Sequence, residues 1–195
     1  MKKIQILSLS LLLFASYSCK ETKKEGKEAM DEIESKMEKV TENEEVKVLK
    51  FSMEPKSGSD VKGEVTFTEE NGTVRMEATI TGLTPGEHAI HIHEKADCSA
   101  EDGTSTGGHW NPTHAKHGKW GDPEGYHRGD IGNITADADG TATLDFSTDE
   151  WCLGCEDETK NLIGKAVIVH EGVDDFVTQP TGAAGGRVSC AGIIK

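Results

Sequence analysis

The chain has 195 residues and a formal net charge of −14 at pH 7. This length is enough for one domain with a hydrophobic core, and the negative charge argues against nucleic acid and anionic lipid headgroups as partners. Its 5% aromatic content and 22 glycines favour a turn-rich all-β fold over a helical one.

The first 18 residues are typical of a signal peptide. A basic start, Met-Lys-Lys, is followed by the apolar stretch 4–14 and by small residues before Cys19. The apolar stretch is too short to span a bilayer. The pattern is similar to a bacterial lipoprotein signal, in which Cys19 becomes the lipidated first residue; the alternative is an ordinary cleaved signal with an incidental cysteine. We expect a periplasmic or outer-membrane protein that meets the membrane only through a lipid anchor at Cys19.

Residues 19–45 are dominated by Lys and Glu. Met30, Ile33, Met37 and Val40 have helical spacing, which leaves a weak amphipathic helix as an alternative. A solvated tether is favoured, because one thin apolar stripe buries too little surface to stabilise a helix. The predicted organisation is a signal peptide over 1–18, a lipidated cysteine and charged tether over 19–45, and a folded domain over 46–195.

From Val46 onward, apolar and polar residues alternate, which indicates β-strands. The expected strands cover residues 46–51, 61–68, 74–80, 87–93, 131–136, 141–146, 162–169 and 187–194. Asn71-Gly72 and Asp139-Gly140 predict tight turns. The pattern predicts an eight-stranded antiparallel Greek-key barrel or sandwich, immunoglobulin-like, with two long functional loops at 94–129 and 171–186.

The loop 94–129 is too long to be a passive connection in a compact domain, so we expect a metal, a disulfide or both to hold it. Beyond Cys19 the chain has four further cysteines, an even number that predicts disulfides in an exported protein. They are Cys98, Cys152, Cys155 and Cys190. Three pairings are possible.

Histidines carry the strongest chemical signal. His91 and His93 lie two residues apart in the strand 87–93, so both imidazoles lie on one face and aim at one point. We expect this face to be exposed, and two exposed histidines in register indicate a metal site. His88 lies on the opposite, apolar face and is expected to be a buried, hydrogen-bonded residue.

Further candidate ligands lie in the first long loop and at the end of a later strand. They are His109, His117, His127, Asp130 and His170. An imidazole-only set suits copper, whereas three histidines with a carboxylate suit zinc. The residues therefore predict a copper site of His91, His93, His170 and one loop histidine. The other loop histidines and Asp130 would form a zinc site, and one histidine would serve both metals.

Five segments match a known pattern in the same order. They are Gly86–Glu94, Gly108–Pro112, His127–Asn133, Val169–Glu171 and Gly186–Gly192. Over 46–195 the chain thereby resembles copper-zinc superoxide dismutases of the bacterial exported type. The resemblance implies one copper and one zinc per chain. It also implies disproportionation of superoxide, a small anion, to oxygen and hydrogen peroxide at a redox-cycling copper beside a structural zinc, as antioxidant defence outside the cytoplasm.

The resemblance also implies a role for each site residue. Copper would be held by His91, His93, His109 and His170, and zinc by His109, His117, His127 and Asp130, with His109 as the bridge. Asp174, rather than its neighbour Asp175, would accept hydrogen bonds from His91 and His117. Arg187 and His109 would be catalytic, with Arg187 receiving the anion. The Cys98–Cys190 disulfide would pin the long loop to the barrel.

Two features depart from the family pattern. Cys152 and Cys155, separated by two residues, could form a tight disulfide, bind a metal or carry out redox chemistry. A disulfide is favoured because no further unassigned ligands are evident. His114 has no counterpart in the pattern and is predicted to be a solvated loop residue.

Arg187 and the metals would supply part of the positive charge that attracts superoxide. The loop 171–186 contains no lysine, so Lys116, Lys119 and Arg128 are the candidates to substitute for it. The alternative function is a copper-binding or delivery module without fast turnover. The complete bridging set and Arg187 argue against that alternative. The sequence does not distinguish a monomer from a homodimer.

Overall fold

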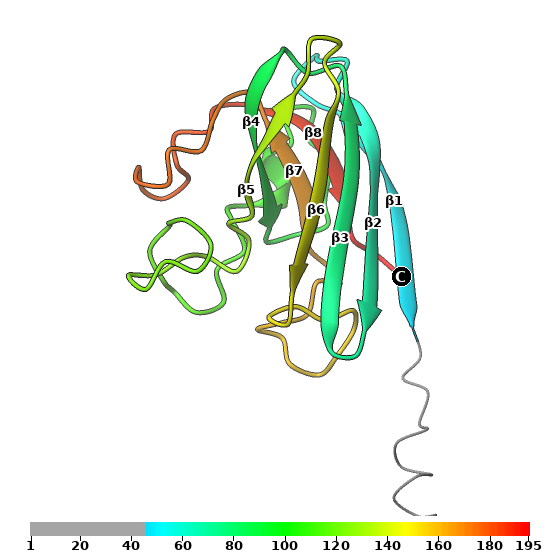
Figure 1. Cartoon of the computed structure of the whole chain (residues 1–195), viewed down its shortest axis with the longest axis vertical. Helices are drawn as coiled ribbons and strands as arrows, with labels where there is room; N and C mark the ends of the chain where they lie inside the picture. The colour runs from blue at the N-terminus through cyan, green and yellow to red at the C-terminus, as the bar shows by residue number, and fades with distance from the viewer. Residues whose placement is uncertain (1–45) are drawn as a thin grey trace, which may run out of the picture. The chain divides into compact units, whose positions relative to one another are not determined.

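The computed structural model describes residues 46–195, so the predicted signal peptide, Cys19 and the tether lie outside the described residues. Eight strands form: β1 Lys47–Pro55, β2 Lys62–Glu70, β3 Thr73–Thr81, β4 Gly86–His93, β5 Gly132–Ala136, β6 Ala142–Thr148, β7 Ala166–His170 and β8 Arg187–Gly192 (Figure 1). A short 3-10 turn, η1 Thr104–Thr106, lies in the first long loop. Within the described range, no helix has the length and apolar character needed to cross a membrane.

The strands form one antiparallel sheet in the order β5-β4-β7-β8-β1-β2-β3-β6. Strands β5 and β6, at the two ends of this order, contact each other, so the sheet nearly closes into a barrel (Figure 1). The predicted all-β, eight-stranded antiparallel Greek-key architecture is confirmed. Both long loops leave the barrel on the same side, which places them beside each other.

The hairpin of β2 and β3 shows how the sequence pattern produces this barrel. Every second residue of β3 from Val74 to Ile80 is buried, and the intervening residues are exposed. The predicted turn at Asn71 and Gly72 forms with φ angles of 51° and 73°, and it sets the register that pairs Glu70 with Thr73. The alternation therefore directs one face of the hairpin into the core.

Strand β4 does not follow this alternation, because every residue from His88 to His93 is buried. The prediction that His91 and His93 lie on an exposed face is wrong. The first long loop continues the edge of β4, where the Ile92 amide donates to the Gly129 carbonyl at 2.9 Å. It also covers the face: the centroid of the His109 ring lies 4.0 Å from that of His91 and 5.1 Å from that of His93. The loop thus supplies a cover that no strand periodicity could reveal.

Several strand boundaries differ from prediction; β8, for example, ends at Gly192 rather than at 194. Strand β7 begins at Ala166 rather than at 162, because residues 162–165 form a turn in which the Lys165 amide donates to the Leu162 carbonyl at 3.1 Å. Gly164, with φ of 89°, allows this turn. Strand β6 extends two residues further than predicted, to Thr148.

Two disulfides are formed within the described residues. Cys98–Cys190 joins the first long loop to β8 across 92 residues of sequence. Cys152–Cys155 closes a loop between β6 and β7, with a sequence separation of 3. The favoured pairing is the one that the structure contains.

Candidate metal centre

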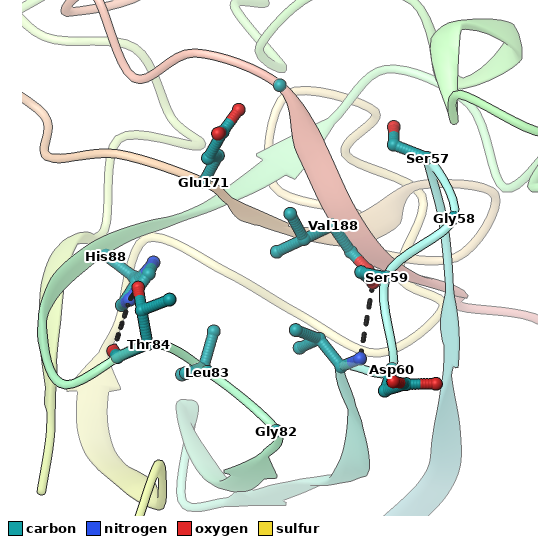
Figure 2. Close-up of a pocket in the computed structure, with 12 residues that line it drawn as sticks. Ser57, Gly58, Ser59, Asp60, Gly82, Leu83, Thr84, His88, Glu171 and Val188 are labelled. Atoms are coloured by element: carbon teal, nitrogen blue, oxygen red, sulfur yellow. Dashed lines mark hydrogen bonds between the residues drawn. The ribbon is translucent and has the colours of Figure 1, made fainter. Parts of the chain in front are cut away.

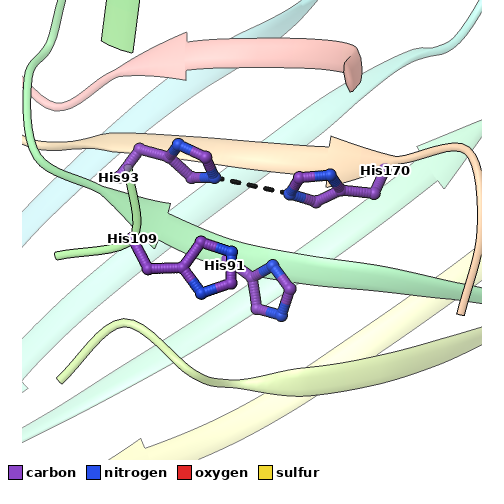
Figure 3. A group of neighbouring side chains, drawn as sticks. All are labelled: His91, His93, His109 and His170. Atoms are coloured by element: carbon purple, nitrogen blue, oxygen red, sulfur yellow. Dashed lines mark hydrogen bonds between the residues drawn. The ribbon is translucent and has the colours of Figure 1, made fainter. Parts of the chain in front are cut away.

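Four histidines from three parts of the chain meet on the outer side of β4 and β7. His91 and His93 project from β4, His170 ends β7, and His109 reaches them from the first long loop (Figure 3). The pairing of β4 with β7 brings these strands into register, with His91 opposite Ile168 and Ile90 opposite Val169. One side-chain nitrogen of each histidine lies within 4.8 Å of the others, and all four side chains are buried. We call this group the four-histidine cluster.

Hydrogen bonds orient three of these rings. His93 Nδ1 lies 3.0 Å from the Gly107 carbonyl and His170 Nδ1 lies 3.3 Å from the Gly185 carbonyl. The remaining nitrogens, both Nε2, face each other at 3.4 Å (Figure 3). His91 is turned the other way: its Nε2 lies 2.9 Å from Asp174 Oδ2, which leaves Nδ1 to face the cluster. Each ring therefore keeps one nitrogen for a shared centre.

A second cluster surrounds Asp130. Its carboxylate lies 2.8 Å from His109 Nδ1, 3.0 Å from His117 Nδ1 and 3.3 Å from His127 Nδ1. Two backbone amides, those of Gly118 and His127, donate to Oδ2 at 3.2 and 2.7 Å and hold it in place. We call His109, His117, His127 and Asp130 the Asp130 cluster; all four residues are buried and share one possible centre.

Unpartnered nitrogens test whether these clusters fit metal ions. Four buried ring nitrogens make no hydrogen bond: His91 Nδ1, His109 Nε2, His117 Nδ1 and His127 Nδ1. A buried polar atom without a partner is costly, so four of them facing two common points call for a ligand. Four imidazole nitrogens suit copper, and three imidazole nitrogens with one carboxylate oxygen suit zinc. The residues fit both metals.

Asp174 connects the two clusters. Its Oδ2 accepts from His91 Nε2 and its Oδ1 from His117 Nε2, both at 2.9 Å, and the side chain is fully buried. Asp175 instead accepts hydrogen bonds from the Val177 and Thr178 amides and is exposed. A carboxylate on the outer nitrogen of a ligating histidine sets the ring orientation and raises its basicity. The structure thus places Asp174 where the family resemblance implied.

The pKa values of the cluster follow from burial and hydrogen bonding. Burial lowers the pKa of His109 to about 4 and that of His170 to about 3, so both rings are neutral at pH 7 and offer a lone pair. Burial also lowers the pKa of His117, but the carboxylates of Asp130 and Asp174 outweigh this effect and raise the pKa to about 9. Burial would raise the pKa of Asp130, yet the three histidines around its carboxylate and the His127 amide hold that pKa well below its usual range.

Arg187 lies beside the four-histidine cluster and is held by the first long loop. Its Nη1 donates to the Gly103 carbonyl at 2.6 Å and to Thr106 Oγ1 at 2.9 Å, and its Nη2 donates to the Gly107 carbonyl at 2.8 Å. The Gly107 carbonyl also accepts from His93 Nδ1. One backbone oxygen therefore positions both the half-buried guanidinium and a histidine of the cluster.

Two of the three cations expected to support Arg187 are paired with carboxylates. Lys116 is paired with Glu124, and Arg128 is paired with Glu150, so the positive charge of each is already balanced. Lys119 is exposed. Lys56, which the sequence did not indicate, is half-buried near Gly103 and donates to the Cys98 carbonyl, so it adds positive charge to the loop that holds Arg187.

Two side-chain amides that the sequence analysis missed hold the site together. Asn133 on β5 exchanges hydrogen bonds with the Asp174 backbone at 2.9 and 2.8 Å. Gln179 in the second long loop does the same with the His117 backbone, at 2.9 Å in both directions. Asn133 lies inside one of the matched segments, which was the available signal, whereas nothing in the sequence pointed to Gln179.

The other two histidines lie outside both clusters, as predicted. His88 is buried at a cavity of about 360 Å³, where its Nε2 lies 2.8 Å from the Thr84 carbonyl (Figure 2). Its Nδ1 lies 3.0 Å from the carbonyl of His170, so His88 forms a hydrogen bond to the last residue of β7. His114 is exposed in the first long loop.

Comparison with known proteins agrees with this geometry. Residues 61–193 match the family model described as copper/zinc superoxide dismutase (SODC). The chain belongs to the copper/zinc superoxide dismutase family. The match includes all seven residues of the two clusters.

Solved structures of related proteins share the fold. A double mutant of a SOD-like protein from Bacillus subtilis has a TM-score of 0.67 and 30% identity, covering 75% of this chain and 97% of that one. A second crystal structure of a SOD-like protein from the same organism has a TM-score of 0.66 and 29% identity, with 74% and 97% coverage. The clock protein EA4 is 37% identical, with a TM-score of 0.63 and coverage of 75% and 94%.

Proposed function

We propose that this member of the copper/zinc superoxide dismutase family is an active superoxide dismutase. One observation carries the proposal: the imidazole of His109 belongs to both clusters, with Nδ1 beside Asp130 and a buried, unpartnered Nε2. Both ligand sets are complete, with copper assigned to the four-histidine cluster and zinc to the Asp130 cluster. When bound, copper supplies the one-electron redox chemistry that disproportionation requires, and zinc supplies a fixed positive charge.

The residues of the chain provide substrate attraction and proton transfer. Arg187 presents a guanidinium fork, held at three points by the first long loop, that suits a small anion such as superoxide. His109 is neutral at pH 7, so its Nε2 can hold a proton and pass it to the peroxide product. The loop cover over β4 limits access of water to this atom.

We also propose where the protein acts. A signal peptide over 1–18, lipidation at Cys19 and a charged tether over 19–45 would place the domain 46–195 outside the cytoplasm, in the periplasm or at the outer membrane. Two disulfides within the domain support export, because disulfides persist in oxidising compartments. Mass spectrometry of the mature N-terminus tests the anchor, and an unacylated start beyond Cys19 would contradict it.

The deciding experiment measures metal content and superoxide disproportionation on the exported protein reconstituted with copper and zinc. We expect one copper and one zinc per chain and rapid turnover that cyanide inhibits. Binding of both metals without turnover would contradict the proposal and favour a copper-binding or delivery module. A chain that binds neither metal would contradict the assignment of both clusters.

A further inference from the structure

The Cys152–Cys155 disulfide contributes no atom to either cluster, yet it directly follows two residues that contact the loop of the Asp130 cluster. These residues are Glu150 and Trp151, which follow β6 after its last residue, Thr148. Their contacts fall on residues 120–128, which lie between two residues of that cluster, His117 and Asp130. The position of the disulfide behind these two residues suggests a role that the metal ligands do not explain.

Trp151 contacts the loop at two points. Its indole N–H donates to the Arg128 carbonyl at 2.9 Å, directly after His127. Its ring packs edge-to-face on Trp120, with centroids 5.6 Å apart and an interplanar angle of 82°. Only 1% of the Trp151 side chain is exposed, and Phe67 of the core packs against its ring. Trp151 therefore links the loop to the barrel core.

Glu150 contacts the same part of the loop through its carboxylate. Oε1 accepts a hydrogen bond from the Tyr126 hydroxyl at 2.8 Å, and Oε2 pairs with the Arg128 guanidinium. The two oxygens thus hold the residues on both sides of His127. We call Glu150 and Trp151 the clamp.

The disulfide stabilises the segment that carries the clamp. Cys152 exchanges backbone hydrogen bonds with Lys160 and Leu162 at 2.8 and 3.0 Å, and Leu153 is buried in the core. Cys155 is only half-buried, and the disulfide joins it to the buried Cys152. Without this bond, the turn after Trp151 has more freedom, because a covalent link limits the conformations that a loop can reach.

We propose that the Cys152–Cys155 disulfide and the clamp position His127 and Asp130 for zinc, and that loss of the disulfide weakens zinc retention while copper retention is largely kept. This inference rests on the proposed function for the identity of the metal. Glu150 and Trp151 act as positioning residues, since they hold the backbone and the neighbours of the ligands. Loss of the disulfide should affect the four-histidine cluster less, because three of its four histidines are held by β4 and β7.

The test compares zinc and copper release from the loaded protein into excess chelator. We expect zinc release from the C152S/C155S variant to be about tenfold faster. Trp151→Phe loses the N–H donor and part of the buried ring, and we expect its zinc release to be about fivefold faster. Copper release should stay within about twofold of the native rate in both variants. Glu150→Gln should accelerate zinc release, whereas Glu156→Gln, at an exposed glutamate beside the disulfide, should not.

Hydrogen–deuterium exchange on the metal-free protein tests the clamp without any metal. We expect faster exchange over residues 117–130 in C152S/C155S and in Trp151→Phe, with β4 and β7 unchanged. Unchanged zinc release together with unchanged exchange would overturn the inference. Exchange that is equally faster throughout the described domain would also overturn it, because that result indicates general destabilisation. If the native chain bound no zinc, the proposed function would fail, and the exchange result alone would decide whether the clamp exists.

Discussion

The two clusters share His109 but are built by different means. The four-histidine cluster takes His91, His93 and His170 from paired strands, where backbone hydrogen bonds set the spacing of the side chains. The Asp130 cluster takes all of its residues from the segment between β4 and β5. Its geometry depends on side-chain contacts, above all those of Asp130 and Asp174.

This difference predicts which cluster depends more on its metal ion for the positions of its ligands. Strand-held ligands keep their positions through the sheet ladder, so the copper side is organised before a metal binds. Loop-held ligands gain order from the ion and from outer hydrogen bonds, so the zinc side should respond more strongly to changes in either. Four predictions test this contrast.

Asp130→Asn should have the largest effect. A structural zinc site contributes roughly 10–16 kcal/mol over four ligands, so loss of one ligand should lower zinc affinity by about a thousandfold. Copper affinity should fall by only about tenfold, through the lost contact to His109 Nδ1. Competition with chelators of known affinity measures both. His114→Ala, at the exposed loop histidine, is the control, and equal losses of zinc and copper would contradict the contrast.

The stability of the metal-free protein should depend on pH in opposite directions through two histidines, His109 and His117. The folded pKa of His109 is about 4, below the unfolded value near 6.5, so the unfolded chain binds more protons between these values. The free energy of unfolding should fall by on the order of 3 kcal/mol as the pH drops from about 6.5 to 4. Urea unfolding at several pH values measures this change.

His117 should act in the opposite direction. Its folded pKa of about 9 lies above the unfolded value, so its contribution to stability is fully present below about pH 6.5 and is lost as the pH rises through 9. A His117→Asn variant should lose this alkaline decline and keep the acid one. A stability profile that is flat in both ranges would contradict the pKa shifts.

Asp174→Asn should lower zinc affinity by about 10- to 100-fold, the usual effect of removing an outer partner of a ligating histidine. We expect a smaller loss of copper affinity, because His91 is also held by β4. The matched control is Asp175→Asn, since Asp175 is the exposed neighbour. If both variants bound zinc equally well, the link between the clusters would have no energetic role.

Arg187→Ala should have the smallest effect on metal binding and a clear effect on rate. With copper and zinc retained, the second-order rate constant for superoxide should fall by about tenfold at low salt. Arg187→Lys should recover part of the rate, because the lysine ammonium keeps the positive charge but lacks the two-pronged donor geometry of the guanidinium. Stopped-flow assays across ionic strengths measure this, and an unchanged rate with unchanged salt dependence would rule out attraction by Arg187.

The sequence was most informative where the pattern is local. The alternation over residues 74–80 and the Asn71-Gly72 turn predicted a hairpin that the structure confirms, because period and turn chemistry act over a few residues. The spacing of His91 and His93 likewise predicted that both side chains point to one place. The exact ends of β6 and β7 were less predictable, since the turn at 162–165 competes with an apolar run.

The sequence alone was least informative about loops. It indicated that the loop 94–129 must be held, but it could not show that this loop covers β4 and buries His91 and His93. Neither Gln179 nor the clamp of Glu150 and Trp151 could be found, because each contacts residues distant in sequence. The pairing of Arg128 with Glu150, which lie 22 residues apart, was hidden for the same reason.

The sequence by itself determined the all-β class, the two tight turns and the set of histidines and carboxylates available for metals, because residue type and short-range spacing specify these. Only the tertiary structure decided which nitrogen of each ring faces the centre, how Asp174 joins the two clusters and what holds the loop in place. Those features depend on hydrogen bonds between segments that meet only after the barrel has folded.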